Sequence, residues 1–495
     1  MSVFDFKSFS DSAKLGNFIA VTETLPADLE TPVSSFLKIA GREKNAFLLE
    51  SAEQEERIGR YSIIGIQPKI LIRSDAAGHL YEVTEGGSPK RLQHKDLPEA
   101  VKSRMSTIKL ANPQDLRGFS GGFTGFLSYE NVADFEDVRL KPLPSAGFPK
   151  GIFLFCRDLV IFDHFRKQLL LATLVAVSRG REKKAWLESQ KNLAELKRRL
   201  SRPLKPEPAA QKPTLPAPKA HLRPQDFEKK VGKIKDYIRA GDCIQVVLSQ
   251  RFSLPFTGED FQIYRALRSV NPSPYMFYFR SGDFRMIGSS PELLVKKTGS
   301  RAEVRPIAGT RPRGASEKED LRQEESLRRS KKELAEHLML VDLGRNDLGR
   351  VCRYDTVKVD QFARVERYSH VMHLVSDVSG KLLPGKTAFD LLKAAFPAGT
   401  VSGAPKIRAM EIINELEEEE RGPYAGCLGY FGLNGDMDMC ITIRTMVLSG
   451  GRIYLQAGAG IVKDSNPKSE YQETVNKAKA LFKALEEQGR FPCFS

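Results

Sequence analysis

Two pairs of glutamates have a spacing that places both members of each pair on one helical face. Glu333 and Glu336 lie in KKELAEHLML, and Glu470 and Glu473 lie in SEYQETVNK. Two such faces brought together would form a site of carboxylate oxygens without thiolates or paired imidazoles, which suits Mg²⁺ better than Zn²⁺. The spacing is common in helices, so on spacing alone two surface salt-bridge faces are the simpler interpretation.

Histidine is scarce in this chain, with seven in 495 residues, and two of them lie close together. His370 and His373 occur in ERYSHVMHLVS, where they would face opposite sides of a strand and nearly the same side of a helix. An imidazole can act as an acid or a base near neutral pH. A structural histidine is the commoner outcome, so the pattern alone leaves both roles open.

Two loops rich in small residues, together with one arginine, indicate an anion site. FPAGTVSGAPK (396–406) and QAGAGIVKDS (456–465) each contain two glycines and a lysine, and Arg444 lies in CITIRTM. Glycine lets the backbone approach a ligand, and successive free N–H groups can cradle an anion. Neither loop fits the P-loop or dinucleotide patterns. Because arginine forms paired bonds to carboxylates, these stretches predict a site for a small carboxylic acid.

The hydrophobic patterning predicts an α+β chain in which several strands follow one another without intervening helices. The predicted strands, which are short apolar or alternating stretches, are 151–177 (a pair broken at DHFRK), 245–254, 275–281, 284–290, 427–433, 439–449 and 452–460. The predicted helices, which have apolar residues three and four positions apart, are 181–200, 228–241, 327–349, 387–396 and 469–488. The acidic run 417–420 is most simply a solvated helix end.

The composition bounds the class of protein. The net charge of +15 fits nucleic acid, an anionic surface or an acidic small substrate, but no zinc-finger spacing or RNP-like aromatic motif supports nucleic acid. Six scattered cysteines without a CxxC pair indicate reduced thiols. We find no apolar run as long as a membrane span and no signal-peptide pattern, so we expect a cytoplasmic protein.

Seven stretches in a fixed order resemble the family of chorismate-utilising enzymes. They are RPIAGTRPRG, EHLMLVDLGRND, VERYSHVMHLVS, FPAGTVSGAPK, RGPYAG, ITIRT and QAGAGIV. The resemblance runs from about residue 25 to residue 485 and implies two intertwined α+β layers with large antiparallel β-sheets flanked by helices. The proline-rich composition of residues 201–224 predicts a linker between an N-terminal domain (1–200) and a second domain (225–490). The resemblance implies that the second domain is the chorismate-binding catalytic domain.

The same resemblance implies roles for individual residues. Glu336 and Glu473 match ligands of Mg²⁺, with Glu333 and Glu470 in support through waters. The residues that match catalytic groups are His373, Thr400 and Glu292, and the last of these would protonate the departing 4-hydroxyl group. The residues that match contacts to the substrate chorismate are Gln245, Ala308, Gly309, Thr310, Tyr424, Arg444, Gly458, Ala459, Gly460 and Lys463.

Two positions bear on which reaction the resemblance implies. Relatives that add water to chorismate carry a lysine where this chain has Gln245, and glutamine cannot act as a base on water. Aminodeoxychorismate synthases commonly carry a nucleophilic lysine where this chain has Ala308. Both differences imply that ammonia adds to ring carbon 2 and that pyruvate then leaves, giving anthranilate. An enzyme that stops at aminodeoxyisochorismate, a lysine-free aminodeoxychorismate route and a non-catalytic basic binding protein stay open.

The resemblance further implies feedback inhibition by tryptophan. LLES (48–51) and NPSPYMFY (271–278) match the two stretches that enclose tryptophan, although on patterning alone they are ordinary strand segments. The implied tryptophan-binding residues are Glu50, Ser51, Pro274, Tyr275, Met276 and Tyr430. We find no glutaminase region in the chain, so the resemblance implies a hetero-oligomer in which a separate glutamine amidotransferase subunit supplies ammonia.

Overall fold

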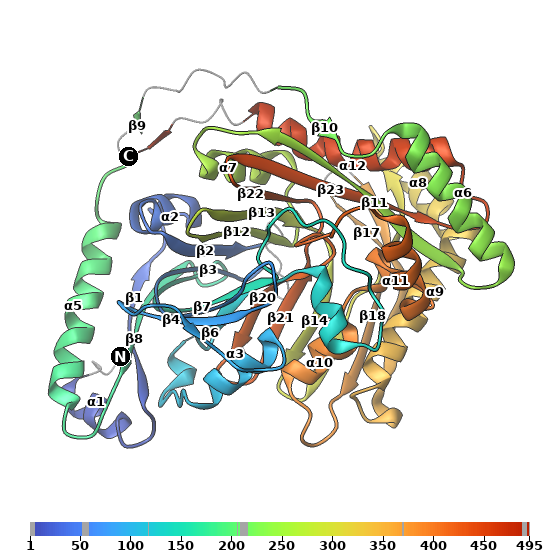
Figure 1. The fold of residues 1–495 in the computed structure, drawn as a ribbon. Helices are drawn as coiled ribbons and strands as arrows, with labels where there is room; N and C mark the ends of the chain where they lie inside the picture. The colour runs from blue at the N-terminus through green and yellow to red at the C-terminus, as the bar shows by residue number, and fades with distance from the viewer. Residues whose placement is uncertain are drawn as a thin grey trace.

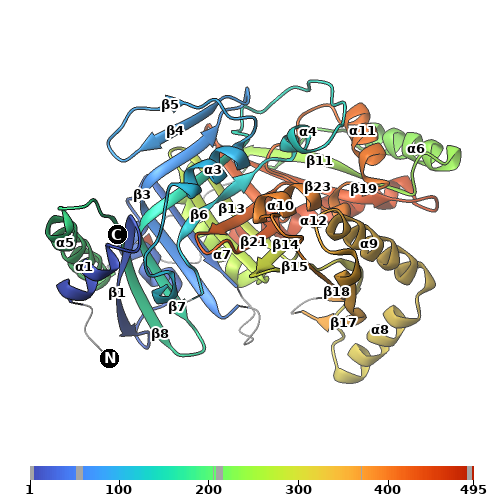
Figure 2. The ribbon, with the colours of Figure 1, turned by 90° about the horizontal axis from the view of Figure 1, so that it is seen from below.

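A computed structural model describes residues 5–51, 59–116, 118–204, 206–207, 216–368, 371–487 and 493–494. Figure 1 shows the ribbon from one side, and Figure 2 shows it from below. Almost all of the strands belong to one extended antiparallel sheet with helices around it, which confirms the predicted α+β class. Over the described ranges, no helix has the length and apolar character needed to cross a bilayer.

The sheet branches at β7 (Gly151–Asp163), a strand that is buried along almost its whole length. On one side β7 pairs with β3 (Tyr61–Ser74). On the other side its first half pairs with β6 (Gly122–Leu127) and its second half with β8 (Gln168–Ala176). The β7–β8 hairpin confirms the strand pair predicted at 151–177, and β8 continues to β1 (Phe18–Pro26).

Two layers extend from this branch point. The first layer runs from β6, in order of pairing, through β20 (Cys427–Gly432), β21 (Met437–Ile441), β14 (Leu293–Thr298), β15 (Arg301–Val304), β18 (Val371–Lys381) and its two partners β16 (Ile307–Pro312) and β17 (Lys358–Arg367). The second layer runs from β3 through β2 (Asn45–Glu50), β12 (Tyr275–Ser281), β13 (Phe284–Ser290), β22 (Thr445–Ser449), β23 (Arg452–Ile461), β11 (Gln245–Pro255) and its partners β10 (Lys219–Ala220) and β19 (Gly403–Ala404). The remaining short strands are β4 (Leu80–Thr84), β5 (Lys90–Arg91), β9 (Pro206–Glu207) and β24 (Cys493–Phe494).

Strands from the two predicted domains lie side by side in both layers. β2 lies between β3 and β12, and β6 lies between β7 and β20. Main-chain hydrogen bonds therefore join the predicted N-terminal domain to the predicted catalytic domain. The division of the chain at 201–224 stays a prediction made from composition.

The main hydrophobic core fills the space between the two layers. Phe126 of β6 stacks on Phe284 of β13, with ring centroids 5.1 Å apart, and meets Phe279 of β12 edge-on at 5.8 Å. A second core covers the outer face of the second layer, where Phe36 stacks on Phe261 at 4.5 Å. Burial of large aromatic side chains on both faces holds the second layer rigidly beneath its helices.

The helices cover the outside of the sheet and its ends (Figure 1). They are α1 (Phe6–Ser12), α2 (Pro32–Ala40), α3 (Leu97–Ser106), α4 (Val132–Phe135), α5 (Glu182–Leu200), α6 (Pro224–Ala240), α7 (Asp260–Val270), α8 (Glu317–Arg329), α9 (Lys331–Gly349), α10 (Ala388–Ala395), α11 (Lys406–Leu416) and α12 (Pro467–Glu487). Helix α12 begins where Asn466 Oδ1 accepts hydrogen bonds from the N–H groups of Lys468 and Ser469, at 3.1 and 3.2 Å. Helix α9 packs against β16 and β18, which places its N-terminal glutamates next to the RPIAGT stretch.

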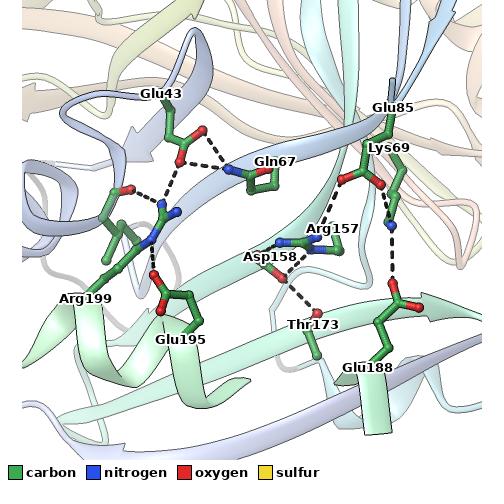
Figure 3. A network of polar contacts seen from close by, with 11 residues as sticks. Glu43, Gln67, Lys69, Glu85, Arg157, Asp158, Thr173, Glu188, Glu195 and Arg199 are labelled. Atoms are coloured by element: carbon green, nitrogen blue, oxygen red, sulfur yellow. Dashed lines mark hydrogen bonds and ion pairs between the residues drawn. The ribbon is translucent and has the colours of Figure 1, made fainter. Parts of the chain in front are cut away.

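Polar contacts along α5 fix this helix to the sheet (Figure 3). Near its C-terminal end, Arg199 forms an ion pair with Glu43 at 2.6 Å, and the same carboxylate accepts hydrogen bonds from Gln67 at 2.8 Å. Closer to its N-terminal end, Glu188 lies 3.6 Å from Lys69 of β3. The helix that precedes the predicted linker is therefore held at two points to β3 and to the loop before β2.

Two predicted elements are each divided in the structure. The stretch 327–349, predicted as one helix, is broken at Ser330, whose backbone is extended. Its hydroxyl oxygen caps α9 by accepting a hydrogen bond from the N–H of Glu333 at 3.4 Å. The stretch 439–449, predicted as one strand, is broken before β22 because Arg444 has a φ of 51°, outside strand geometry. Both elements were therefore predicted too long, because the backbone angles of one residue, Ser330 or Arg444, interrupt each of them.

Candidate active site and a separate cavity

His373 lies on β18 and faces a glycine bulge in β16. Gly309 shifts the β16–β18 register with a φ of 63°, and its carbonyl oxygen accepts a hydrogen bond from Nδ1 of His373 at 2.9 Å. This contact assigns the proton to Nδ1 and leaves Nε2 as the basic nitrogen. Burial lowers the pKa of His373, although the bond to Gly309 opposes that shift. The imidazole is therefore neutral at pH 7 and able to accept a proton.

Glu292, between β13 and β14, is a buried carboxyl group. Burial raises its pKa to about 8, and the neighbouring Thr400 hydroxyl and Lys477 ammonium groups oppose the shift. Thr400 lies in the short turn η4 (Gly399–Val401), and its Oγ1 is enclosed without completing a hydrogen bond of ordinary geometry in the described chain. Glu292 therefore keeps its proton near neutral pH and can donate it to a leaving oxygen.

Gly458 and Gly460 lie on β23 beyond its pairing with β22. That pairing extends only to Leu455, so within the described ranges no strand covers this edge of β23 at the two glycines. A Cβ atom at Gly458 would lie 2.6 Å from the hydroxyl oxygen of Tyr424, and one at Gly460 would lie 3.3 Å from the side-chain amide of Gln245. The glycines thus keep an open backbone edge between Tyr424 and Gln245, as an anion cradle requires.

Arg444 is an enclosed cation beside this edge. Burial lowers its pKa, and the charges of Glu473 and Tyr424 oppose the shift, but its guanidinium group makes no hydrogen bond or ion pair in the described chain. Its charge also lowers the pKa of His373, so the two side chains are near each other. A partly buried guanidinium group without a carboxylate partner in the described chain is the strongest sign in this region of a site for an anionic ligand.

A second sign is an unsatisfied amide. Oε1 of Gln245, which is 3% exposed, has no hydrogen-bond partner within the described residues. Native structures rarely leave such an atom unpaired, and here Oγ1 of Thr400 is unpaired as well. A polar ligand between β11, η4 and β23 would satisfy both.

The four glutamates of the predicted metal site come from the first two turns of α9 and α12. Burial raises the pKa of Glu336, and the carboxylates of Glu333 and Glu473 raise it further. Burial also raises the pKa of Glu470, and Glu473 adds to the shift. A divalent cation would relieve this repulsion, and an all-carboxylate set fits Mg²⁺. Among the residues that the structure describes, no three acidic, histidine or cysteine side chains lie close enough together to hold a metal ion.

Two cations that the sequence analysis did not single out balance these glutamates. Lys477 forms an ion pair with Glu473 at 2.7 Å and donates a hydrogen bond to the carbonyl oxygen of Gly458 at 2.9 Å. Arg311, in the RPIAGTRPRG stretch, lies 3.1 Å from Glu333. The signal available for Lys477 was its position one helical turn after a candidate ligand, on the same face of α12.

The acidic run 417–420 begins with a buried residue, so its interpretation as a solvated helix end was wrong for Glu417. The carboxylate of Glu417 accepts hydrogen bonds from Arg421 at 2.7 and 2.8 Å and from the N–H and hydroxyl groups of Ser249 at 2.9 and 2.8 Å. Arg421 also donates to carbonyl oxygens of η4 and β11, both at 2.7 Å. This buried pair ties together two elements that carry predicted site residues.

The remaining predicted contacts are placed around the same groups, with one exception. Ala308 is buried on β16 directly before the bulge, and the Thr310 hydroxyl oxygen lies 3.1 Å from Nδ1 of His373. Ala459 is buried between the two glycines of β23. Lys463 has an exposed side chain that makes no hydrogen bond or ion pair in the described chain. His370 lies outside the described residues.

A cavity of about 1420 Å³ lies apart from these groups. Its lining includes every residue predicted to bind tryptophan, which are Glu50, Ser51, Pro274, Tyr275, Met276 and Tyr430. Glu50 accepts hydrogen bonds from the Tyr264 hydroxyl group at 2.5 Å and from Arg268 at 2.6 Å, and the Tyr275 hydroxyl group donates to Asp438 at 3.0 Å. None of the predicted catalytic or substrate-contacting residues lines this cavity. The structure thus separates the residues predicted to bind tryptophan from those predicted to bind and convert the substrate.

Comparisons with known proteins place this arrangement in a class. A model of a family described as chorismate binding enzyme matches residues 44–483, and the chain belongs to that family. A structure of the menaquinone-specific isochorismate synthase MenF from Escherichia coli has the same fold, with a TM-score of 0.72 at 19% identity over 97% of this chain and 98% of that one.

Closer relatives carry one name. Anthranilate synthase component 1 of Acetivibrio thermocellus is 43% identical over 483 residues, which cover 96% of this chain and 97% of the relative. The protein of that name from Aquifex aeolicus is 45% identical over 476 residues, 95% of each chain. The crystal structure of anthranilate synthase component I from Streptococcus pneumoniae matches with a TM-score of 0.75 at 37% identity, over 93% of this chain and 99% of that one.

Proposed function

We propose that this chain is the component of anthranilate synthase that converts chorismate and ammonia to anthranilate, pyruvate and water, the first committed step of tryptophan biosynthesis. The observation that carries the proposal is the grouping of a protonated acid, a neutral base and an unpaired arginine, which are Glu292, His373 and Arg444. Relatives with this name align with nearly the whole chain and support the same activity.

The reaction requires one proton donor and one base. As ammonia forms a bond to ring carbon 2, the 4-hydroxyl group departs, and Glu292 donates the proton that converts it to water; the amine then returns a proton to Glu292. Nε2 of His373 takes the proton from carbon 2, the bond between ring carbon 3 and the enolpyruvyl oxygen breaks, and pyruvate leaves with a proton from His373. Arg444 binds a carboxylate of the substrate throughout.

Mg²⁺ is the cofactor that the donor set supports. Glu336 and Glu473, with Glu333 and Glu470, would hold it, because the negative charges of Glu333 and Glu473 raise the pKa of Glu336, Glu473 also raises that of Glu470, and a cation would relieve this repulsion. The bound ion would supply positive charge against the ring carboxylate of chorismate. The residues of the chain itself provide the proton transfers.

Two side chains support ammonia, rather than water or a covalent amine, as the nucleophile. Gln245 beside the β23 edge has no basic group that could activate water, and its unpaired Oε1 can accept a hydrogen bond from ammonia. Ala308, buried next to the Gly309 bulge, offers no nucleophile and leaves room for a small reactant. Both features favour direct attack on the ring.

We further infer regulation and a partner for the same enzyme. Tryptophan would bind in the cavity of about 1420 Å³, since all six residues implied by the sequence line it. A separate glutamine amidotransferase chain would supply ammonia in a cytoplasmic hetero-oligomer, as the word component in the relatives' names suggests.

A product assay tests the activity directly. Purified chain would be mixed with chorismate, Mg²⁺ and ammonium at mildly alkaline pH, and products would be read by fluorescence and mass. Anthranilate with equimolar pyruvate, lost with EDTA and suppressed by tryptophan, is the expected result. An aminated product that keeps the enolpyruvyl group would replace the proposal with the enzyme that stops early. No consumption of chorismate, even with a glutaminase subunit present, would overturn it.

A further inference from the structure

Glu366 lies directly opposite His373 where β17 pairs with β18. Residues opposite each other on antiparallel strands project to the same face of the sheet, so the carboxylate and the imidazole are neighbours. Tyr368 connects them, because its hydroxyl group donates to Oε2 of Glu366 at 2.9 Å and its ring meets the ring of His373 at 61°, with centroids 5.6 Å apart. The acid is thus joined to the predicted base through one side chain.

Two arginines hold Glu366 from its other side. Arg364 donates to Oε1 of Glu366 at 2.7 Å, and Arg305 donates to the same oxygen. Both arginines also contact Asp377, at 2.6 and 3.2 Å. Arg305 begins the RPIAGT stretch, so the residue that binds Glu366 lies four positions before Gly309, whose carbonyl oxygen holds Nδ1 of His373.

All four charged residues line the separate cavity. Arg305, Arg364, Glu366 and Asp377 are part of its wall, together with the residues predicted to bind tryptophan. His373 itself does not line the cavity. The side chain of Glu366 therefore belongs both to the wall of the cavity and to the surroundings of His373.

We propose that Glu366 is a positioning residue for His373, which it orients together with Tyr368, and that Arg305 and Arg364 set the strength of this action from the cavity side. Other groups face His373 as well. The Gly309 carbonyl and Glu366 favour its protonated form, whereas Arg444 and burial disfavour it. Only the kinetic consequence of the inference rests on the proposed function.

Opposite charge changes around Glu366 provide the test, since they should act on His373 in opposite directions. The ring of His373 would be titrated by ¹⁵N NMR in the ligand-free protein, and its signals would be assigned with His373→Asn. Glu366→Gln removes the negative charge and should lower the pKa of His373. Arg305→Gln leaves Glu366 less neutralised and should raise it. Glu366→Asp, which keeps the charge, should restore most of the shift.

Asp360 provides the matched control. It lies on the same strand and forms an ion pair with Arg301 at 2.6 Å, but it is not opposite His373, so Asp360→Asn should leave the ring pKa unchanged. In turnover, Glu366→Gln should lower kcat about tenfold with KM within about twofold, as expected when a base is misoriented.

An unchanged ring pKa in both Glu366→Gln and Arg305→Gln would overturn the inference, as would shifts in the same direction. If Glu366→Gln does not fold, Arg305→Gln and Glu366→Asp still decide the sign. If the wild-type protein makes no anthranilate, the proposed function fails, while the NMR titration continues to test the inference by itself.

Discussion

One residue of the candidate active site, Glu292, has a protonation state that changes near pH 8. Glu292 must carry a proton in order to protonate the leaving hydroxyl group, and burial raises its pKa to about 8. At saturating free ammonia, kcat should therefore fall as pH rises through about 8. Replacement by glutamine should lower kcat about 10²–10³-fold with little change in KM, since a general acid contributes on that scale. Steady-state kinetics across pH 6–9 would measure both effects.

The same substitution should affect stability in the opposite sense. Because the folded-state pKa of Glu292 lies above the unfolded value near 4.5, the stabilising contribution of its neutral form is complete below about pH 4.5 and is lost as pH rises from there to about 8. Glu292→Gln should thus melt above the wild type at pH 9, less far above it at pH 6, and at a similar temperature at about pH 4. Glu303→Gln, on the neighbouring strand β15, is the control. Equal kcat in the Glu292 variant and the wild type would remove the acid from the mechanism.

Arg444 should show the same conflict between binding and stability. Arg444→Met removes an enclosed cation that has no partner in the described chain, so the melting temperature should stay equal or rise. It also removes a charge-assisted contact to substrate, so kcat/KM for chorismate should fall about 100-fold, which corresponds to roughly 3 kcal/mol. Calorimetry and initial rates measure the two quantities.

The exposed Lys463 supplies the comparison for Arg444. If Lys463→Met weakens chorismate binding more than Arg444→Met does, the carboxylate site has been placed on the wrong side chain. That outcome would also place the substrate carboxylate nearer to the loop between β23 and α12 than to Gly458 and Gly460.

At the scale of elements, the N-terminal two turns of α9 and of α12 should act as one metal site. Glu473→Gln removes one carboxylate and should weaken Mg²⁺ binding about tenfold in isothermal titration, since each carboxylate contributes directly to affinity for a hard cation. Glu486→Gln lies on the same helix at an exposed position and should bind Mg²⁺ normally. Unchanged Mg²⁺ affinity in Glu473→Gln would show that the two helices do not share an ion.

The buried pair of Arg421 and Glu417 should matter more for stability than any surface ion pair of the chain. Arg421→Met leaves a buried carboxylate without its cation and should lower the free energy of unfolding by about 3–5 kcal/mol. The double variant with Glu417→Leu should recover part of that loss, because neither charge then remains buried. Urea denaturation would measure it, and a double variant less stable than the single one would contradict this account.

Local pattern predicted most of the strands because their apolar residues alternate or run together. The sequence placed 275–281 and 284–290 as they occur in β12 and β13. It missed the ends set by a single residue, at Ser330 and Arg444, since a cap or a left-handed φ leaves the hydrophobic periodicity unchanged. Glu417 was misread for a related reason. Its partner Ser249 lies 168 positions away, and a sequence pattern carries no information about such a contact.

The candidate site was predictable only in part. The glutamates, His373 and the glycines could be named from motifs of a recognised family, because those motifs lie in short contiguous stretches. Lys477 and Glu366 were not named, although Lys477 lies one turn after Glu473 and Glu366 lies within the stretch VERYSHVMHLVS. Their contacts depend on the packing of α12 against β23 and on the β17–β18 register, which the motifs do not specify. The roles of all these residues stay predictions until variants are measured.

At the scale of the whole molecule, the separate cavity predicts that inhibition and catalysis can be uncoupled. Ser51→Phe fills part of the cavity wall but lies among none of the groups assigned to turnover. The variant should keep kcat within about twofold and lose inhibition by tryptophan, because added bulk displaces a ligand from a formed pocket. Titration calorimetry with tryptophan and rates with and without it would test this. Retained inhibition would place the regulatory site elsewhere.

The position of β2 between β3 and β12, and of β6 between β7 and β20, has a consequence for how the protein can be made. A gene divided near residue 210 would yield two polypeptides, each with long unpaired strand edges that are templates for aggregation. Neither piece could serve as an autonomous module in a fusion protein. Produced together in one cell, however, each polypeptide would supply the strands that the other lacks, and the two would fold together into one non-covalent complex.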